Sequence, residues 1–376
     1  MVTERENSLV DCFSDLKDPR VERTRKHKLI DIIIISICGV IAGANGFEAI
    51  EVFADMHQEW LKKFLELPHG IPSHDTFERV FARINPKEFQ KRFSEWTKIL
   101  SSTFANEIIA VDGQTLRRSH DHSNQKSTIH VVSAWAAKAG LVLGQVKVDE
   151  KSNEITAIPE VLRMLDLRGC IVTTDALGCQ QAIAKQIIDQ DGDYLFGLKK
   201  NQGNTLEAVQ EHFDLDTSKP TQNFTENDKA HGRVETRTYT IDSAQNVLDL
   251  KIWPGIKSVV KVNSIREMKN KTTNDTRFYI SSLPPDSPRI STAVRGHWGV
   301  ENGLHYVMDE TFDQDRSRLR TDNSAENFTV LRHIALNLLK QAPTMKGIKS
   351  INMKRFRAGM DTQYLERILK TQNYAT

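Results

Sequence analysis

The chain has 376 residues, a formal net charge of +2, 39% hydrophobic residues and 27% charged residues, which is ordinary for a globular protein of two or three domains. Its four cysteines form no CxxC or Cys/His pattern, which argues against a zinc finger and suits buried free thiols in a reducing cytoplasm. The polar residues 1–7 are unlike a signal peptide, and the apolar run 29–44 is shorter than the roughly 20 residues that span a bilayer, so no membrane partner is expected.

Residues 1–104 are predicted to form an N-terminal helical domain. Apolar residues recur at helical spacing through residues 50–65. The run 29–44 is expected to be a buried core helix, with a strand as the weaker alternative. Ser73 is a candidate N-cap for an amphipathic helix over residues 76–81, and Pro86 suits the first turn of the next helix.

From residue 108 the pattern changes to short apolar runs separated by turns, which predicts an antiparallel meander that continues into covered strands and helices. This order of elements is the plan of an α/β ribonuclease-H-like core, in which the fourth strand lies beside the first. The predicted elements are, in order, strands at 108–111, 128–136 and 141–148, a helix at 156–167, a strand at 170–174, a helix at 180–191 and a strand at 194–198.

Residues 201–285 are polar and rich in strand-forming residues, and we interpret them as a β-rich insertion domain. The helical pattern resumes afterwards, so the core is predicted to comprise residues 105–200 and 286–345, followed by a basic helical tail at 346–376. Basic runs at 20–28 and 346–357 either pair with phosphates or are solvated helix surfaces.

Three carboxylates stand out because of where they lie. Asp112 and Asp175 each follow an apolar strand, and in this fold plan both strand ends would lie within metal-bridging distance. Glu301 lies on a predicted helix and shares one face with His305 and Asp309. Alone, each acid has an ordinary explanation: a turn former, a helix cap and an exposed polar face, respectively. Together they predict a site for two divalent cations about 4 Å apart, which need oxygen ligands on rigid elements.

Polar and cationic residues surround these acids and are candidate phosphate contacts. The stretch 231–237 alternates on a predicted strand, so its charged residues either follow a DNA strand or form the wet face of a small sheet. The candidate contacts are Arg117 and Arg118 after Asp112, Lys199 and Lys200 after the fifth strand, His231, Arg233 and Arg237 in the alternating stretch, Arg295 and Trp298 before Glu301, and Arg316 and Arg318 after it.

The chain resembles bacterial insertion-sequence DDE transposases of the H-repeat-associated, Rhs-element type. The resemblance covers nearly the whole chain; the stretches that carry it most clearly lie at 110–117, 149–160, 173–176, 193–202, 231–233 and 295–302. It implies that Asp112, Asp175 and Glu301 are the catalytic acids and metal ligands. Related transposases carry a lysine about two turns after the glutamate, where this chain has Met308 and Asp309; Arg316 or Arg318 would then take that role.

The resemblance implies a transposase that cuts element ends and joins the 3′ hydroxyl to target DNA with two Mg²⁺ ions, for which Mn²⁺ would substitute. Double-stranded DNA is the expected partner, a homodimer the expected assembly, and residues 73–81 a candidate recognition helix in a DNA-binding N-terminal domain. The alternatives are a domesticated DNA-binding protein without turnover, and a zinc hydrolase that uses Glu301 and His305.

Overall fold

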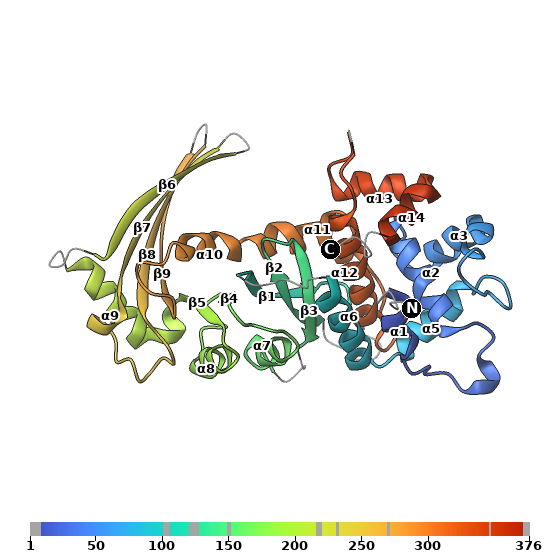
Figure 1. Cartoon of the computed structure of the whole chain (residues 1–376), viewed down its shortest axis with the longest axis horizontal. Helices are drawn as coiled ribbons and strands as arrows, with labels where there is room; N and C mark the ends of the chain where they lie inside the picture. Colours follow the sequence, from blue (N-terminus) through green and yellow to red (C-terminus); the bar gives the residue numbers. More distant parts are fainter. Residues whose placement is uncertain are drawn as a thin grey trace, which may run out of the picture.

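The computed structural model describes residues 9–100, 106–119, 128–148, 152–215, 220–230, 233–268, 271–345 and 347–370. The molecule is elongated: the first helices and the last helices gather at one end, and four long strands form the other end (Figure 1). A mixed sheet with helices on both faces lies between them. The fold is therefore of the mixed α/β type.

The N-terminal segment is helical, as predicted. Its helices are α1 (Leu9–Ser14), α2 (Leu29–Ile41), α3 (Phe47–Met56), α4 (Gln58–Leu61), α5 (His74–Arg83) and α6 (Pro86–Leu100). Almost every residue of α2 is buried, which confirms the core helix. Ser73 occupies the N-cap of α5, but its hydroxyl meets Thr76 Oγ1 at 3.3 Å rather than a backbone N–H. Asn85 Oδ1 caps α6 by accepting from the backbone N–H of Lys87 at 3.0 Å.

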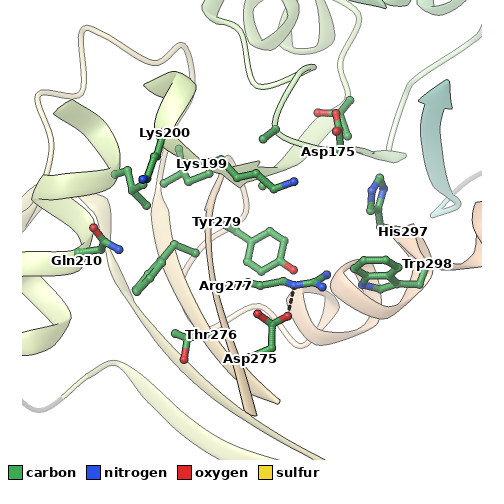
Figure 2. Close-up of a pocket in the computed structure, with 16 residues that line it drawn as sticks. Asp175, Lys199, Lys200, Gln210, Asp275, Thr276, Arg277, Tyr279, His297 and Trp298 are labelled. Atoms are coloured by element: carbon green, nitrogen blue, oxygen red, sulfur yellow. Dashed lines mark hydrogen bonds and ion pairs between the residues drawn. The ribbon is translucent and has the colours of Figure 1, made fainter. Parts of the chain in front are cut away.

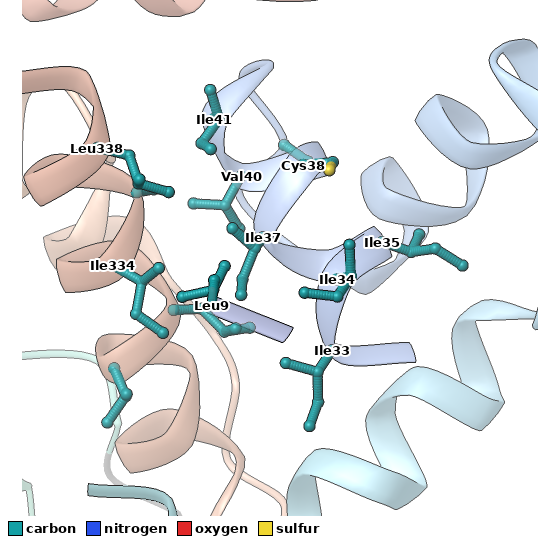
Figure 3. Packing of buried hydrophobic residues seen from close by; sticks show 14 of the residues in the cluster. Leu9, Ile33, Ile34, Ile35, Ile37, Cys38, Val40, Ile41, Ile334 and Leu338 are labelled. Atoms are coloured by element: carbon teal, nitrogen blue, oxygen red, sulfur yellow. The ribbon is translucent and has the colours of Figure 1, made fainter. Parts of the chain in front are cut away.

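Helix α2 joins the two ends of the chain in one core. It packs against α12 (Ser324–Gln341), and Figure 3 shows Ile37 and Val40 facing Ile334 and Leu338. All four of these side chains are fully buried. The N-terminal helices are thus held by hydrophobic burial against the helix that also covers the sheet.

The first five strands confirm the predicted order of elements. They are β1 (Ile108–Leu116), β2 (Ile129–Ala136), β3 (Leu141–Lys147), β4 (Ile171–Thr174) and β5 (Asp193–Leu198), with α7 (Glu154–Arg163) and α8 (Gln181–Asp189) between the later ones. Their spatial order is β3-β2-β1-β4-β5. The first three strands are antiparallel, whereas β4 runs parallel to both β1 and β5, so the fourth strand does lie beside the first.

The four strands after β5 continue the same sheet. The region predicted to be a β-rich insertion is rich in strands, and its standing as a domain of its own stays a prediction. Strand β9 pairs antiparallel with β5, and the sheet has nine strands in the order β3-β2-β1-β4-β5-β9-β8-β7-β6. The added elements are α9 (Gly203–Asp214), β6 (Gln222–Ala230), β7 (Arg233–Ser243), β8 (Ser258–Met268) and β9 (Lys271–Ser281). The sequence did not predict α9 or β6, because β6 is a polar edge strand with a single aromatic residue, Phe224.

The segment after β9, where the sequence predicts a return to helix, is divided into three parts. These are α10 (Arg289–His297), a π-helical turn η4 (Glu301–His305) and α11 (Tyr306–Glu310). After α12, the chain ends in α13 (Ile351–Met360) and α14 (Thr362–Lys370). In the described part of the chain, no helix has the length and apolar character that crossing a membrane requires. The four cysteines are free thiols and three of them are buried, as expected.

The basic run near the C-terminus contains two structural cations, which neither interpretation of the sequence anticipated. Lys354 Nζ donates to the carbonyls of Leu339 and Ala342, each at 2.8 Å, at the end of α12. Arg355 donates to the carbonyl of Val40, at 3.0 and 3.2 Å, at the end of α2. Both side chains are only 4% exposed. They satisfy helix C-terminal carbonyls, which attract positive charge.

Arg355→Ala is therefore expected to lower the free energy of unfolding by about 3–5 kcal/mol, because buried acceptors lose a charged donor and Phe312 loses the guanidinium stacked on its ring. Urea unfolding would measure this change. Lys349→Ala, at an exposed position of the same basic run, serves as the control and should change stability by less than about 0.5 kcal/mol. A similar small effect for both variants would contradict the capping role.

Candidate active site

Strand register brings Asp112 and Asp175 together. Val111 of β1 pairs with Thr174 of β4 in parallel register, so the residues that follow them, Asp112 and Asp175, lie at the same level. Strand β4 ends at Thr174, but β1 continues through Asp112 to Leu116, so the prediction that Asp112 lies at a strand end was wrong. Four residues earlier, Ile108 and Ile171 lie in one core cluster with the side chains of α10. Because side chains alternate along a strand, the two carboxylates belong to this same α10 side of the sheet.

The segment from α10 to η4 crosses this side of the sheet from β4 to β1. At one end, His297 Nδ1 lies 3.2 Å from Thr173 Oγ1 of β4. At the other, His305 Nδ1 lies 3.7 Å from Asp112 Oδ2 of β1. Glu301 is four residues from each of these histidines, so it lies between the two strands that carry the aspartates. Its own side chain is exposed.

Two glycines let this segment approach the sheet closely. A Cβ added at Gly296 would lie 2.9 Å from Ile108 Cγ2, and one at Gly303 would lie 2.7 Å from Trp135 Cζ2. Either contact is closer than side chains tolerate, so a larger residue would push the helix away from β1 and β2. Glu301 lies between these two glycines in the chain, so a larger residue at either position would shift the segment that carries it.

The electrostatics of Asp112 reflect its burial and the acids around it. Burial raises the pKa of Asp112 to about 7, and the negative charges of Asp175, Glu154 and Glu301 add to the increase. Clustered carboxylates repel one another, and a bound cation relieves that repulsion. Burial also lowers the pKa of His305 to about 4, which keeps the imidazole beside Asp112 neutral near pH 7.

The side chain of Asp175 is held by the turn that follows β4. Its Oδ1 accepts hydrogen bonds from the backbone N–H groups of Leu177, at 2.9 Å, and Gly178, at 3.4 Å. The alternative considered for this residue, a helix cap, is wrong, because the next helix, α8, begins at Gln181 with Gln180 at its N-cap. Asp175 instead stabilises the turn that follows β4. These two bonds use one carboxylate oxygen and hold the side chain beside the sheet edge.

The acids are arranged for cations but do not form a closed metal cage. Over the described residues, no group of three His, Cys, Asp or Glu side chains is close enough to hold a metal ion as it stands. Asp112 and Asp175 fit a hard cation by chemistry and by mutual repulsion, and Glu301 would have to turn inward to join them. The zinc alternative gains no support, because His305 and Asp112 are in contact but no third ligand among the described residues completes a zinc site with them.

Sequence reasoning missed a neighbouring pair, His130 and Glu154. His130 Nε2 lies 2.6 Å from Glu154 Oε1, and its Nδ1 lies 2.9 Å from Thr115 Oγ1. The pair packs over Gly113, where an added Cβ would lie 2.2 Å from Glu154 Oε1. Glu154 begins α7 and His130 lies on β2, so only the three-dimensional fold brings them beside Asp112.

A cavity of about 660 Å³ opens beside Asp175 (Figure 2). His297 and Trp298 line one side, and Lys199 and Lys200 come from the end of β5. The guanidinium of Arg277 lies 4.3 Å from the ring centroid of Trp298. Arg277 also pairs with Asp275, at 2.6 Å. The cavity thus combines aromatic surface with cations next to one of the acids.

The remaining candidate DNA contacts are distributed around this region. Arg117 pairs with Asp315 at 3.3 Å, Arg316 with Asp313 at 3.6 Å and Arg295 with Asp228 at 2.7 Å, whereas Arg118 and Arg318 are exposed. His231 and the side chain of Arg233 lie outside the described residues.

The described part of the alternating stretch, on β7, is not the wet face of a small sheet. Arg237 is 15% exposed and its guanidinium binds Glu235, which is 4% exposed, at 2.7 Å. The same alternation continues to Tyr239 and Ile241, which are fully buried in the cluster that includes α10. This side of β7 therefore turns toward the interior, and the role of Arg237 at DNA stays a prediction.

Two carboxylates on adjacent parallel strand segments, at the same level of a mixed sheet, are chemically suited to divalent cations. Comparison with known proteins makes this more specific. Residues 103–338 match the family model described as transposase DDE domain, and residues 10–97 match the one described as DDE_Tnp_1-associated. The chain belongs to the DDE transposase family, in its H repeat-associated type.

Three relatives illustrate this membership. The H repeat-associated protein YhhI of Escherichia coli (strain K12), provisionally named a transposase, is 41% identical over 96% of this chain and 97% of its own. Protein YbfL of the same strain is 40% identical, with coverage of 96% and 97%. YbfQ, named an inactive transposase, is 47% identical over 15% of this chain and 68% of its own.

A solved structure of the piggyBac transposase synaptic complex with hairpin DNA also aligns with this chain. The alignment covers 97% of this chain and 77% of that one, at 10% sequence identity and a TM-score of 0.41. The likeness is too distant for any residue role to be transferred.

Proposed function

We propose that this protein is a DNA transposase with a ribonuclease-H-like core, which cleaves element ends and joins the 3′ hydroxyl to target DNA. The observation that carries the proposal is the parallel register of β1 and β4, which sets Asp112 beside Asp175 on the side that α10 and Glu301 cover. Family membership supports the same activity.

Asp112, Asp175 and Glu301 would hold two Mg²⁺ ions, for which Mn²⁺ would substitute. When bound, the ions supply an activated water and stabilise the leaving oxygen of the phosphodiester. The protein contributes rigid ligand positions: Asp112 by its place on β1, Asp175 by its turn hydrogen bonds, and Glu301 by its place between His297 and His305. No nucleophilic side chain is required by this chemistry.

The cavity beside Asp175 supports the assignment of DNA as the substrate. Cations and aromatic surface lie together there, which is how proteins bind single nucleic-acid strands. Helix α5 of the N-terminal segment is a candidate recognition helix, because Phe77, Val80 and Phe81 anchor it while its other side remains accessible. A homodimer would cut both element ends together.

A cleavage assay tests the proposal against the domesticated-binder alternative. The substrate is a labelled duplex that carries the sequences flanking the coding region, incubated with protein and Mg²⁺ or Mn²⁺. We expect metal-dependent strand cleavage at the element end, followed by joining to a second duplex. Specific binding without cleavage in either metal would instead identify a DNA-binding protein that does not turn over.

Lys199→Ala/Lys200→Ala is expected to weaken duplex binding roughly tenfold at about 0.1 M salt, because both exposed cations stand at the cavity. The salt dependence of the affinity should decrease by about two phosphate contacts. Fluorescence anisotropy across a salt series measures both quantities. Lys185→Ala/Lys251→Ala, at exposed positions that do not line the cavity, is the control. Equal effects of the two double variants would show that general charge, and not this site, attracts DNA.

A further inference from the structure

Strand β1 continues past Asp112, and its side chain Gln114 forms hydrogen bonds with the segment that follows Glu301. Gln114 Nε2 donates to Asp309 Oδ1 at 3.0 Å and to Oδ2 at 3.1 Å. The other end of the same amide, Gln114 Oε1, accepts from Gln314 Nε2 at 3.2 Å. Gln314 is only 3% exposed. The Gln114 amide therefore has a fixed orientation, and it fixes Asp309 in turn.

The π-helical turn gives these anchors a consequence for Glu301. The turn occupies residues 301–305, with His297 bonded to Thr173 on β4 before it and Asp309 bonded to Gln114 on β1 after it. A π turn holds one residue more than an α-helical turn. If it relaxed to an α-helix, the residues after it would rotate by about 100° relative to those before it. Either Glu301 or Asp309 would then lose its place.

We propose that Asp309 and Gln114 are positioning residues for Glu301. Their hydrogen bonds hold the end of the π turn on β1, while His297 holds its beginning on β4, and the turn is thereby kept in the form that places Glu301 between the aspartates. Neither residue touches DNA or a cation in this role. The inference rests on the proposed function, in which Glu301 is the third metal ligand.

Burial of Asp309 agrees with an internal role. Burial raises the pKa of its carboxyl to about 6, and the negative charge of Asp315 adds to the increase. A solvent-exposed polar face, which was the ordinary explanation for the Glu301, His305 and Asp309 series, does not describe this residue, because its carboxylate is directed at Gln114. The ion pair between Arg117, which directly follows β1, and Asp315 also holds the segment after Glu301 against β1.

The test measures Mn²⁺ binding by isothermal titration calorimetry on the full-length protein with a bound duplex. Asp309→Ala is expected to weaken Mn²⁺ binding roughly tenfold, equivalent to about 1.4 kcal/mol, with duplex affinity unchanged. Asp309→Asn keeps an acceptor for Gln114 and should restore binding to within about threefold of the original. Glu310→Ala, at an exposed position on the same helix, is the control and should leave Mn²⁺ binding unchanged.

A double-mutant cycle separates positioning from general stabilisation. If Asp309 acts through Glu301, Asp309→Ala will weaken Mn²⁺ binding no further in a Glu301→Gln background. Gln114→Ala should behave in the same way, and it replaces Asp309→Ala should that variant fail to fold. Additive losses, or unchanged Mn²⁺ binding in both variants, overturn the inference while wild-type cleavage leaves the transposase proposal intact. A wild-type protein that neither binds Mn²⁺ nor cuts DNA overturns both.

Discussion

Asp112→Asn is expected to abolish metal-dependent cleavage and, at the same time, to stabilise the metal-free protein. Loss of the Asp112 carboxylate should lower the cleavage rate by roughly 1000-fold, equivalent to about 4 kcal/mol of transition-state stabilisation. Duplex binding should remain, because no part of the DNA-binding surface is changed. Single-turnover cleavage of a labelled duplex and anisotropy measure the two quantities.

The stability gain follows from the raised pKa of Asp112. Its carboxyl has a pKa of about 7 in the folded protein and an ordinary value of 3.8, so the folded state holds the proton more tightly than the unfolded state. The contribution of this group to the free energy of unfolding therefore declines as the pH rises from about 4 to about 7, and it stays low above that. The Asp112→Asn variant lacks the decline and should be a few kcal/mol more stable at pH 8.

Thermal unfolding across pH 4–8 without divalent metal would check this. The control is Asp55→Asn, at an exposed position on α3, which should follow the wild-type curve. Added Mn²⁺ should raise the Tm of the wild-type protein and have little effect on Asp112→Asn, because a ligand stabilises only the state that binds it. A destabilised Asp112→Asn protein at pH 8 would mean that the carboxylate is held by favourable contacts and not by repulsion.

The sequence was sufficient for the part of the site that depends on strands. An apolar run that ends in an acid predicts both strands and the position of Asp175 just after β4, and the parallel order of β1 and β4 then follows from the order of elements. The same pattern misplaced the end of β1, because the strand continues past Asp112 through polar residues that still pair with β2. Glu301 could be placed on a helix for the same reason. Local patterns alone carry this information, because burial on both faces leaves a continuous apolar run.

The rest depends on contacts between distant residues, which no local pattern contains. Arg355 looks like a surface cation until the end of α2 lies beside it, 315 residues away in sequence. The π turn needs anchors on β1 and β4 that only the folded sheet supplies, and Glu154 reaches Asp112 only after α7 has packed. Strand β6 was missed because an edge strand need not be apolar.

Glu301→Gln is expected to abolish cleavage as fully as Asp112→Asn, by roughly 1000-fold, but without stabilising the protein. Because Glu301 is exposed, its replacement should change the metal-free free energy of unfolding by less than about 0.5 kcal/mol at any pH from 4 to 8. The Mn²⁺-dependent rise in Tm should shrink, since one ligand of the cation pair is lost while Asp112 and Asp175 remain.

The two variants together test whether the acids form one site with unequal surroundings. The charge of Asp112 is disfavoured by burial and by neighbouring acids, whereas Glu301 is exposed. Replacing either residue should therefore cause the same loss of cleavage but a different dependence of stability on pH. Glu301→Asp sharpens the comparison, because it retains the charge and shortens the side chain by one methylene; we expect it to recover some Mn²⁺ binding but little cleavage. Cleavage retained by Glu301→Gln would exclude this glutamate as the third ligand. Its exposed side chain would then have no need to turn toward the aspartates when DNA and metal bind.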